Sequence, residues 1–232
     1  MSRDNASALA RPSPAPTSTG RIPWLTIIRT RFPGLAAFGC ALAGGPERWV
    51  YIGLAVYWLA DLLDGLLARA LHQETIFGAE FDILTDRIQI CLFYVLYVSF
   101  HPEKTLVALI FLFEFMVLDH FLSNQFVRWP IRSPNYFYQV DRLTWWWLSS
   151  KPAKGLNTGL VTLLTICVPS IWPSLSVAVG LIIVRVYFAW RVLLLSADVR
   201  AARREARLAS HAPGLRQATG TAAGPARAVQ AA

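Results

Sequence analysis

The chain has 232 residues, of which 55% are hydrophobic and only 16% are charged, and its mean hydropathy is +0.42. The apolar residues gather in blocks of about 18 to 20, the length that crosses a bilayer as a helix. These blocks exclude a secreted disulfide scaffold, a disordered regulator and a typical soluble enzyme. Because they are continuously apolar rather than alternating, they also argue against a closed β-barrel. We therefore expect an all-α, polytopic membrane protein.

The formal net charge is +8. The basic residues lie mainly in the predicted tails and loops, so the expected partners are anionic lipid headgroups and not nucleic acid. The three cysteines lie far apart in apolar segments and form no CxxC pair. This spacing argues against both a disulfide framework and a zinc site.

The chain begins with residues 1–20, which are rich in Ala, Pro, Ser and Thr and are expected to form a disordered tail. Residues 21–32 (RIPWLTIIRTRF) are amphipathic and predict an N-terminal helix lying in the membrane interface. Residues 198–232 are basic and are expected to form a second disordered tail. Between the tails, a membrane domain over residues 21–197 is expected to contain six transmembrane helices, at 33–45, 49–71, 81–100, 105–122, 156–172 and 174–196.

The distribution of charge predicts the orientation of these helices. Seventeen basic residues fall on one predicted side, in residues 1–31, at Arg69, in the loop 123–154 and in the tail from residue 198. The opposite turns hold only Arg48 and Lys104. Cytoplasmic loops carry the excess of Lys and Arg. We therefore expect a protein of the cytoplasmic membrane with both termini in the cytoplasm, which requires an even number of spans.

Four of the eight aspartates fall within one 26-residue window, at Asp61, Asp64, Asp82 and Asp86. The spacing of the first pair places both on one face of a helix, and the spacing of the second pair does the same on the next helix. The connection between the helices is short, so they are expected to be antiparallel neighbours. The window lies in or beside two predicted spans, where carboxylates are costly and usually functional. The two acidic faces are then expected to converge at the cytoplasmic end.

Clustered carboxylates in a partly dry site cannot all stay ionised without a counter-charge. Two divalent cations would supply it, and all-oxygen ligands favour Mg²⁺, Mn²⁺ or Ca²⁺ over zinc or copper. Two such ions form a clamp suited to phosphoryl transfer. Gly65 and Gly78 would allow a nucleotide to approach the backbone closely, and Arg69 could bind a phosphate with its fork of donors.

The stretch from Asp61 to Asp86 fits the pattern D-x2-D-G-x2-A-R-x8-G-x3-D-x3-D without departure. This pattern resembles the signature of the CDP-alcohol phosphatidyltransferase family, and the resemblance extends over roughly residues 22–197. It implies transfer of a phosphatidyl group from a CDP-linked lipid, usually CDP-diacylglycerol, to a small acceptor alcohol, with release of CMP. It further implies bound Mg²⁺ or Mn²⁺ and a homodimer.

The resemblance also implies a role for each motif residue. The implied metal ligands are Asp61, Asp64, Asp82 and Asp86. Asp86 is in addition the implied general base that takes the proton of the acceptor hydroxyl. The CDP head of the donor is implied to lie against Gly65, Arg69 and Gly78.

The identity of the acceptor depends on residues outside this motif. Spare basic residues on the cytoplasmic side favour an anionic acceptor, with glycerol 3-phosphate as the first candidate among phosphorylated polyols. The candidate ligands of its phosphate are Lys151, Lys154 and Arg185. Arg185 lies mid-span, where it either pairs with Glu114 or Asp119 or lines the polar cavity.

Two other classes of function would also use clustered acidic residues. A cation transporter or channel could use the intramembrane Asp cluster as an ion site, but the Gly, Ala and Arg of the motif have no role there. A non-catalytic scaffold could pair the acids with Arg69 and Arg87 alone. Four acids against two arginines would leave too much uncompensated charge for that reading.

Overall fold

A computed structural model describes the backbone of residues 23–70 and 75–220, and the side chains of residues 30–63, 66 and 75–201. The described residues form helices and turns, with no strand among them. Among the described residues, three helical stretches are long and apolar enough to cross a membrane: Ile76–Phe100, Pro102–Arg128 and Trp172–Ala201. The all-α class is therefore confirmed, with three candidate spans, while the number of six spans stays a prediction.

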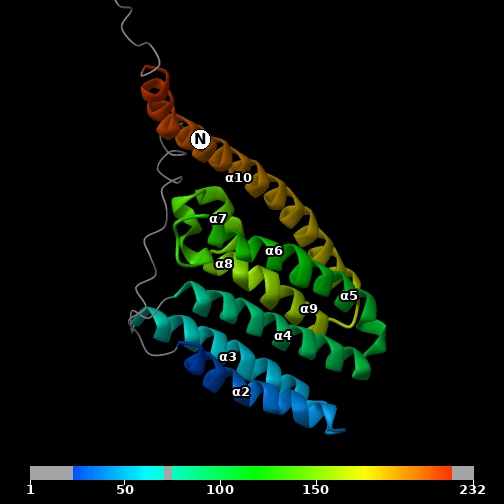
Figure 1. The fold of residues 1–232 in the computed structure, drawn as a ribbon. Coiled ribbons are helices and arrows are strands. Elements are labelled where there is room, and N and C mark those ends of the chain that lie inside the picture. The colour runs from blue at the N-terminus through cyan, green and yellow to red at the C-terminus, as the bar shows by residue number, and fades with distance from the viewer. Residues whose placement is uncertain (1–22, 71–74, 221–232) are drawn as a thin grey trace, which may run out of the picture. The chain divides into compact units, whose positions relative to one another are not determined.

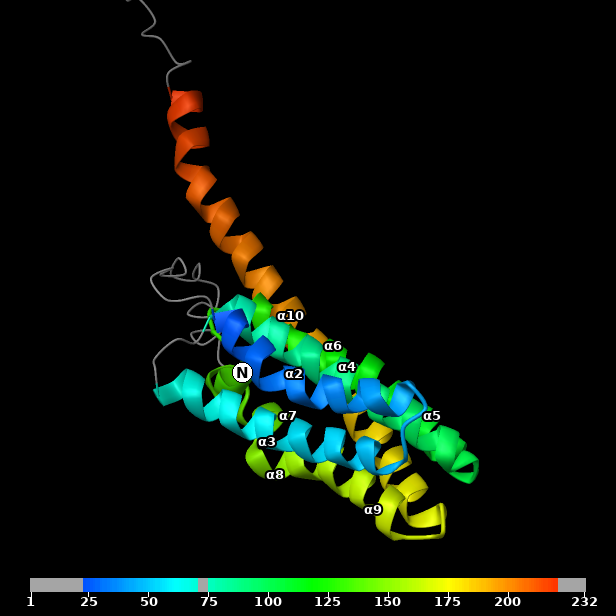
Figure 2. The same cartoon turned by 90° about the horizontal axis from the view of Figure 1, so that it is seen from below.

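The N-terminal helix α2 (Pro23–Leu42) runs through residues that the sequence divides between an interfacial helix and a first span, with Pro33 inside it. No break separates the two predicted parts. Proline removes one backbone hydrogen bond, but packing along the whole length of a helix can outweigh that loss. Figures 1 and 2 both show α2 lying beside its neighbour α3 (Arg48–Ala70), which returns after a turn at Gly44.

Small residues allow α2 and α3 to approach closely. A Cβ atom added to Gly53 would lie 2.5 Å from the ring of Phe38, and one added to Gly34 would lie 3.4 Å from the carbonyl oxygen of Gly53. A larger side chain at Gly53 would therefore push the two helices apart. This close contact positions Arg31, on α2, against the acidic part of α3.

Helix α4 (Ile76–Phe100) packs against both α2 and α3 and supplies much of the core. Its Phe93, Tyr94 and Tyr97 are almost completely buried, and the Tyr94 ring lies 5.0 Å from the ring of Phe111 on α5 (Thr105–Phe113). Thr75 caps the start of α4 by accepting a hydrogen bond from the backbone N–H of Gly78. This cap fixes where the helix carrying Asp82 and Asp86 begins.

Two of the later helices contain a single turn of π-helix. The helix that begins with α5 continues through the π turn η2 (Glu114–Asp119), then α6 (His120–Ser123) and the 3₁₀ turn η3 (Asn124–Arg128). The short helix α8 (Lys151–Lys154) continues through the π turn η5 (Gly155–Leu160) into α9 (Val161–Cys167). Such turns are rare and often occur at functional sites.

Between these two helices the chain forms the 3₁₀ segment η4 (Pro134–Gln139) and the short helix α7 (Arg142–Leu148). The ring N–H of Trp145 donates to the carbonyl oxygen of Asn135, at 2.8 Å, and so ties α7 to η4. The carboxylate of Asp141 accepts two hydrogen bonds from Arg191, at 2.8 and 2.9 Å. Because Asp141 directly precedes α7, these bonds hold α7 against α10.

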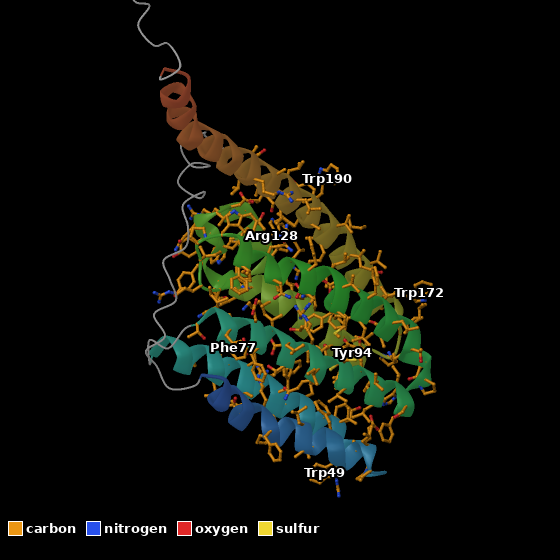
Figure 3. The ribbon with its side chains drawn as sticks, in the orientation of Figure 1. Trp49, Phe77, Tyr94, Arg128, Trp172 and Trp190 are labelled. Carbon is orange, nitrogen blue, oxygen red and sulfur yellow. The ribbon has the colours of Figure 1, made fainter. Side chains whose placement is uncertain are left out.

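The last helix, α10 (Trp172–Gly220), is longer than the predicted span. It continues through residues 198–220, which the sequence assigns to a disordered tail, because that stretch is rich in Ala and Arg, both strong helix formers. The part of α10 up to Leu193 belongs to the compact unit that contains the other helices, and the part from Leu194 belongs to a second unit. In the unit that contains the other helices, Trp172 and Trp190 are 68% and 66% exposed and point away from the neighbouring helices (Figure 3). They suit contact with lipid.

Candidate active site

Three of the four acidic residues of the motif converge. Asp61 from α3 and Asp82 and Asp86 from α4 each offer a carboxylate oxygen, and these three atoms lie within 4.8 Å of one another. Asp61 and Asp82 are about half and two-fifths exposed, at 47% and 39%, whereas Asp86 is 22% exposed. The backbone of Asp64 lies on α3, but its side chain is outside the described part of the chain.

The chemistry of these donors fits magnesium or manganese. All three ligand atoms are carboxylate oxygens, which hard divalent cations prefer. Asp61, Asp82 and Asp86 would hold such an ion, since their ligand oxygens gather within 4.8 Å of one another.

The sequence did not single out Arg31, which is the counter-charge of this cluster. One of its terminal nitrogens lies 3.2 Å from Asp61 Oδ1 and 2.9 Å from Asp82 Oδ1, and the other lies 2.8 Å from Asp86 Oδ1. The Arg31 side chain is only 1% exposed. The positive charge of Arg31 is visible in the amphipathic stretch 21–32, but the sequence does not show that this side chain points into the helix bundle.

A second group of buried charges lies next to the cluster. Arg87 pairs with Asp119 on η2, and its guanidinium carbon lies 3.7 Å from the centre of the Phe115 ring. Arg185 on α10 lies 3.0 Å from Glu114 and 2.9 Å from Asp119. Two arginines and two carboxylates therefore compensate one another. The scaffold alternative required Arg87 to pair with the motif aspartates, but Arg87 contacts Asp119 and points to a different face of α4 from Asp86.

A cavity of about 120 Å³ connects the two groups of charges. Its lining includes all three aspartates of the cluster, together with Arg87, Asp119 and Arg185. Arg185 thus fulfils both alternatives left open by the sequence, since it pairs with the two acids and also lines the cavity. The π turns contribute to the same lining through Phe115, Asp119, Asn157 and Thr158.

The candidate acceptor lysines differ in position. Lys154 lines the cavity, and its ammonium group donates to the side-chain oxygen of Asn135 at 3.2 Å. Lys151 is exposed and is not among the described residues that line the cavity. Several buried polar atoms of the lining make no hydrogen bond to the described residues, among them Arg185 Nη1, Ser133 Oγ and Asn157 Oδ1. Buried polar groups normally have partners, so these atoms are available to water or to a polar ligand.

The arrangement of carboxylates beside a polar cavity can be compared with known families. Residues 23–135 match the CDP-alcohol phosphatidyltransferase family. The resemblance predicted from the Asp motif is thereby confirmed. Comparisons with curated proteins and with solved structures found no significant match. A match to this family implies transfer of a phosphatidyl group from a CDP-alcohol.

The match to the phosphatidyltransferase family runs from the start of α2 to the beginning of η4, just under half of the chain. It contains the Asp cluster and Arg31, but it ends before Lys154 and Arg185. The acceptor side of the cavity therefore depends on residues beyond the matched segment. These residues have to be judged from their geometry alone.

The residues expected at the CDP head are only partly described. Gly65 and Arg69 lie on α3, but outside the residues whose side chains the structure describes. Gly78 is buried in the first turn of α4, where its N–H donates to Thr75, and its neighbour Ala79 lines the cavity. The backbone next to Gly78 thus borders the cavity.

Proposed function

We propose that this protein transfers the phosphatidyl group of CDP-diacylglycerol to a small phosphorylated polyol, with release of CMP. The observation that carries the proposal is the convergence of Asp61, Asp82 and Asp86 within the family motif, at the wall of a polar cavity. The cavity is lined both by these carboxylates and by the cationic side chains of Lys154 and Arg185, which suits two reactants that are both phosphates.

Asp61, Asp64, Asp82 and Asp86 hold two Mg²⁺ or Mn²⁺ ions in this proposal. When bound, the ions neutralise the pyrophosphate and stabilise the charge that develops on it during transfer. The protein's own contribution is to fix the carboxylates at the facing parts of two packed helices. Because Asp82 and Asp86 are one helical turn apart, α4 presents both to the same side.

Asp86 acts as the general base. It lines the cavity and remains 22% exposed, so a hydroxyl group of the acceptor can reach its free carboxylate lone pairs. The acceptor oxygen forms a bond to the β-phosphorus, and the bond from that phosphorus to the CMP oxygen breaks. The electron pair of the broken bond leaves with CMP, and the proton of the hydroxyl passes to Asp86.

The donor's CDP head lies along Gly65, Arg69 and Gly78 in this proposal. A glycine allows the phosphates to approach the helix backbone, and the guanidinium of Arg69 can donate two hydrogen bonds to one phosphate. The acyl chains stay in the bilayer while the nucleotide faces the cytoplasm. A site at the boundary between membrane and water meets both needs.

The acceptor phosphate binds at the other end of the cavity, on Lys154 and Arg185. Lys154 carries a charge that the described contacts pair only with an amide oxygen. Arg185 Nη1 and Ser133 Oγ are buried donors without hydrogen-bond partners among the described residues. Lys154, Arg185 and Ser133 all line the cavity, and donors of this kind suit a phosphate, with glycerol 3-phosphate as the first candidate. We leave Lys151 out of this pocket, because it does not line the cavity.

The membrane setting completes the proposal. The basic loops and the family are consistent with six spans, an interfacial start of α2, both termini in the cytoplasm and a homodimer. Residues of η4 and α8 line part of the cavity, and both elements belong to the loop 123–154, which carries five basic residues. The site would thus open to the cytoplasm.

The proposal can be tested by incubating the purified protein in lipid nanodiscs with Mg²⁺, labelled CDP-diacylglycerol and one acceptor at a time. We expect a new phospholipid with glycerol 3-phosphate or another phosphorylated polyol. Preference for serine or an uncharged alcohol would overturn the acceptor assignment. No lipid product with any acceptor, together with Mg²⁺ or Mn²⁺ flux in vesicles, would favour the cation transporter instead.

A further inference from the structure

The Arg31 guanidinium lies where the carboxylates of the Asp cluster are closest to one another. It contacts one oxygen each of Asp61, Asp82 and Asp86 at 2.8 to 3.2 Å, and these are the residues whose oxygens gather within 4.8 Å. Arginine remains charged at any pH a protein encounters. A permanent cation therefore accompanies the cluster whenever no ion is bound.

Several contacts hold Arg31 in place. The side-chain amide of Gln89 donates to its backbone carbonyl at 3.1 Å, and its guanidinium carbon lies 5.3 Å from the centre of the Tyr57 ring. The side chain is 1% exposed, whereas Asp61 and Asp82 are each more than one-third exposed. The carboxylates thus have a buried side facing Arg31 and an open side facing the cavity.

We propose that Arg31 is an internal competitor of the divalent cations, which holds the Asp cluster together in the ion-free protein and weakens its affinity for metal. This inference rests on the proposed function, in which the same carboxylates hold Mg²⁺ or Mn²⁺. The three carboxylates carry three negative charges, and Arg31 offsets one of them. It also occupies lone pairs of the oxygens that an ion would use.

Two consequences follow from this position of the charge. Without Arg31, three carboxylates packed within 4.8 Å would repel one another, so the ion-free protein would be less stable. An incoming cation, in contrast, would no longer meet a positive charge beside its ligands and would bind more tightly. A purely structural arginine, which supports the ligands without competing, predicts the opposite change in metal affinity.

The test is to titrate Mn²⁺ into chelator-treated, full-length protein in nanodiscs, with free Mn²⁺ measured by electron paramagnetic resonance. Arg31→Gln should bind Mn²⁺ about tenfold more tightly than the wild type, or more. It should also melt at a lower temperature in EDTA and gain more from saturating Mn²⁺. Unchanged or weaker Mn²⁺ binding by Arg31→Gln would overturn the inference.

Two further variants make the result interpretable. Arg31→Lys retains the charge but not the two-nitrogen fork, so it should shift the Mn²⁺ midpoint in the same direction by less. If Arg31→Gln does not fold, an unshifted Arg31→Lys protein contradicts the inference. Arg191→Gln is the matched control, because it also breaks a guanidinium–carboxylate pair but one formed with Asp141. It should lower stability without moving the Mn²⁺ midpoint.

Failure of this inference and failure of the proposed function give different results. If the wild-type protein binds Mn²⁺ and Asp86→Asn binds it more weakly, the metal site stands, and only the comparison with Arg31→Gln decides the role of Arg31. If neither the wild type nor Arg31→Gln binds Mn²⁺, the metal site itself is wrong, and the inference falls with it.

Discussion

Arg31 and Arg87 show how far single residues can be interpreted from their neighbours in sequence. Arg87 follows Asp86 directly, but consecutive residues of a helix point about 100° apart, and Arg87 pairs with Asp119 on another helix. Asp86 pairs instead with Arg31 on α2. The spacing of the aspartates predicts their shared face, because that depends on one helix alone. The partner from a distant helix depends on packing, which spacing does not contain.

The role of Asp86 can be tested by a change that keeps its shape. Asp86→Asn removes the charge and the basicity, so turnover should fall by about 10²- to 10⁴-fold while membrane insertion is unaffected. The rate of phospholipid formation in purified protein measures this. Glu80→Gln, an exposed acid on the same helix, is the control and should retain normal turnover. Near-normal turnover in Asp86→Asn would reject Asp86 as the base.

The acceptor pocket can be tested through the two lysines of α8. Lys154→Gln removes a cation that lines the cavity, so the acceptor KM should rise by about tenfold or more, which corresponds to one charge-assisted hydrogen bond, while the KM for the CDP-lipid changes little. Lys151→Gln is the matched control and should change neither value. Equal effects of the two substitutions would show that Lys154 acts only through the general positive charge of the loop.

Arg185 is a less suitable test of the same pocket. Its partner Glu114 is completely buried, so Arg185→Gln would leave a buried carboxylate without its ion pair. Breaking one side of such a pair typically costs about 3–5 kcal/mol of unfolding free energy. A loss of activity in this variant would therefore reflect stability as much as acceptor binding.

At the scale of the elements, the apolar blocks predict that a helix exists better than they predict whether it contains a π turn. Helix α4 and the helix from α5 to η3 include the predicted spans 81–100 and 105–122. The π turns at Glu114–Asp119 and Gly155–Leu160 were not predicted. An inserted turn changes the direction of side chains without changing hydropathy, so composition carries no sign of it. Yet these turns direct Asp119 and Asn157 toward the cavity.

The link between α7 and α10 predicts a dependence on pH. Burial alone would raise the pKa of Asp141, but the hydrogen bonds from Arg191 and Thr144 outweigh it and lower that pKa below its usual value. The link therefore contributes its full stability above the usual Asp pKa of about 4 and loses it as the pH falls through the lowered value. Between pH 7 and 5 it should be unaffected.

Asp141→Asn should remove this contribution at neutral pH and free α7 from α10. We expect the free energy of local opening of α7 to fall by about 1–3 kcal/mol, toward the lower end because Arg191 is partly exposed to water. Hydrogen exchange of the α7 amides measures the change. Asp198→Asn, at an exposed aspartate of α10, should leave the exchange of α7 unaltered. Full protection of α7 in Asp141→Asn would show that its aromatic packing suffices.

At the scale of the whole molecule, the charge count predicts which side each turn faces. In a protein whose three cysteines are replaced, single cysteines at Pro46 and Glu103 should react with a membrane-impermeant reagent added from outside the cell. Both positions are exposed turns next to Arg48 and Lys104. A cysteine at Gln139, in the basic loop, should react only after the membrane is opened. Labelling of Gln139 alone from outside would invert the proposed topology.

The fold class and the Asp cluster could be predicted from sequence, because both depend on local patterns of hydropathy and spacing. The merging of two predicted elements into α2 and the extension of α10 could not be predicted. In α2, favourable packing offsets the effect of Pro33, and in α10, helix propensity offsets the basic composition of the tail. The second charge group, from Glu114 to Arg185, joins helices far apart in the chain. Its separate charges were visible in the sequence, but their mutual compensation was not.

The most direct test of the account follows CMP and phospholipid formed from CDP-diacylglycerol and glycerol 3-phosphate by the purified protein, before and after exhaustive chelation. The Asp cluster needs divalent ions to engage a pyrophosphate, since Arg31 supplies only one of its charges. The account predicts that chelation abolishes both products and that Mg²⁺ or Mn²⁺ restores them together. Full formation of CMP and phospholipid in the chelated protein would contradict it.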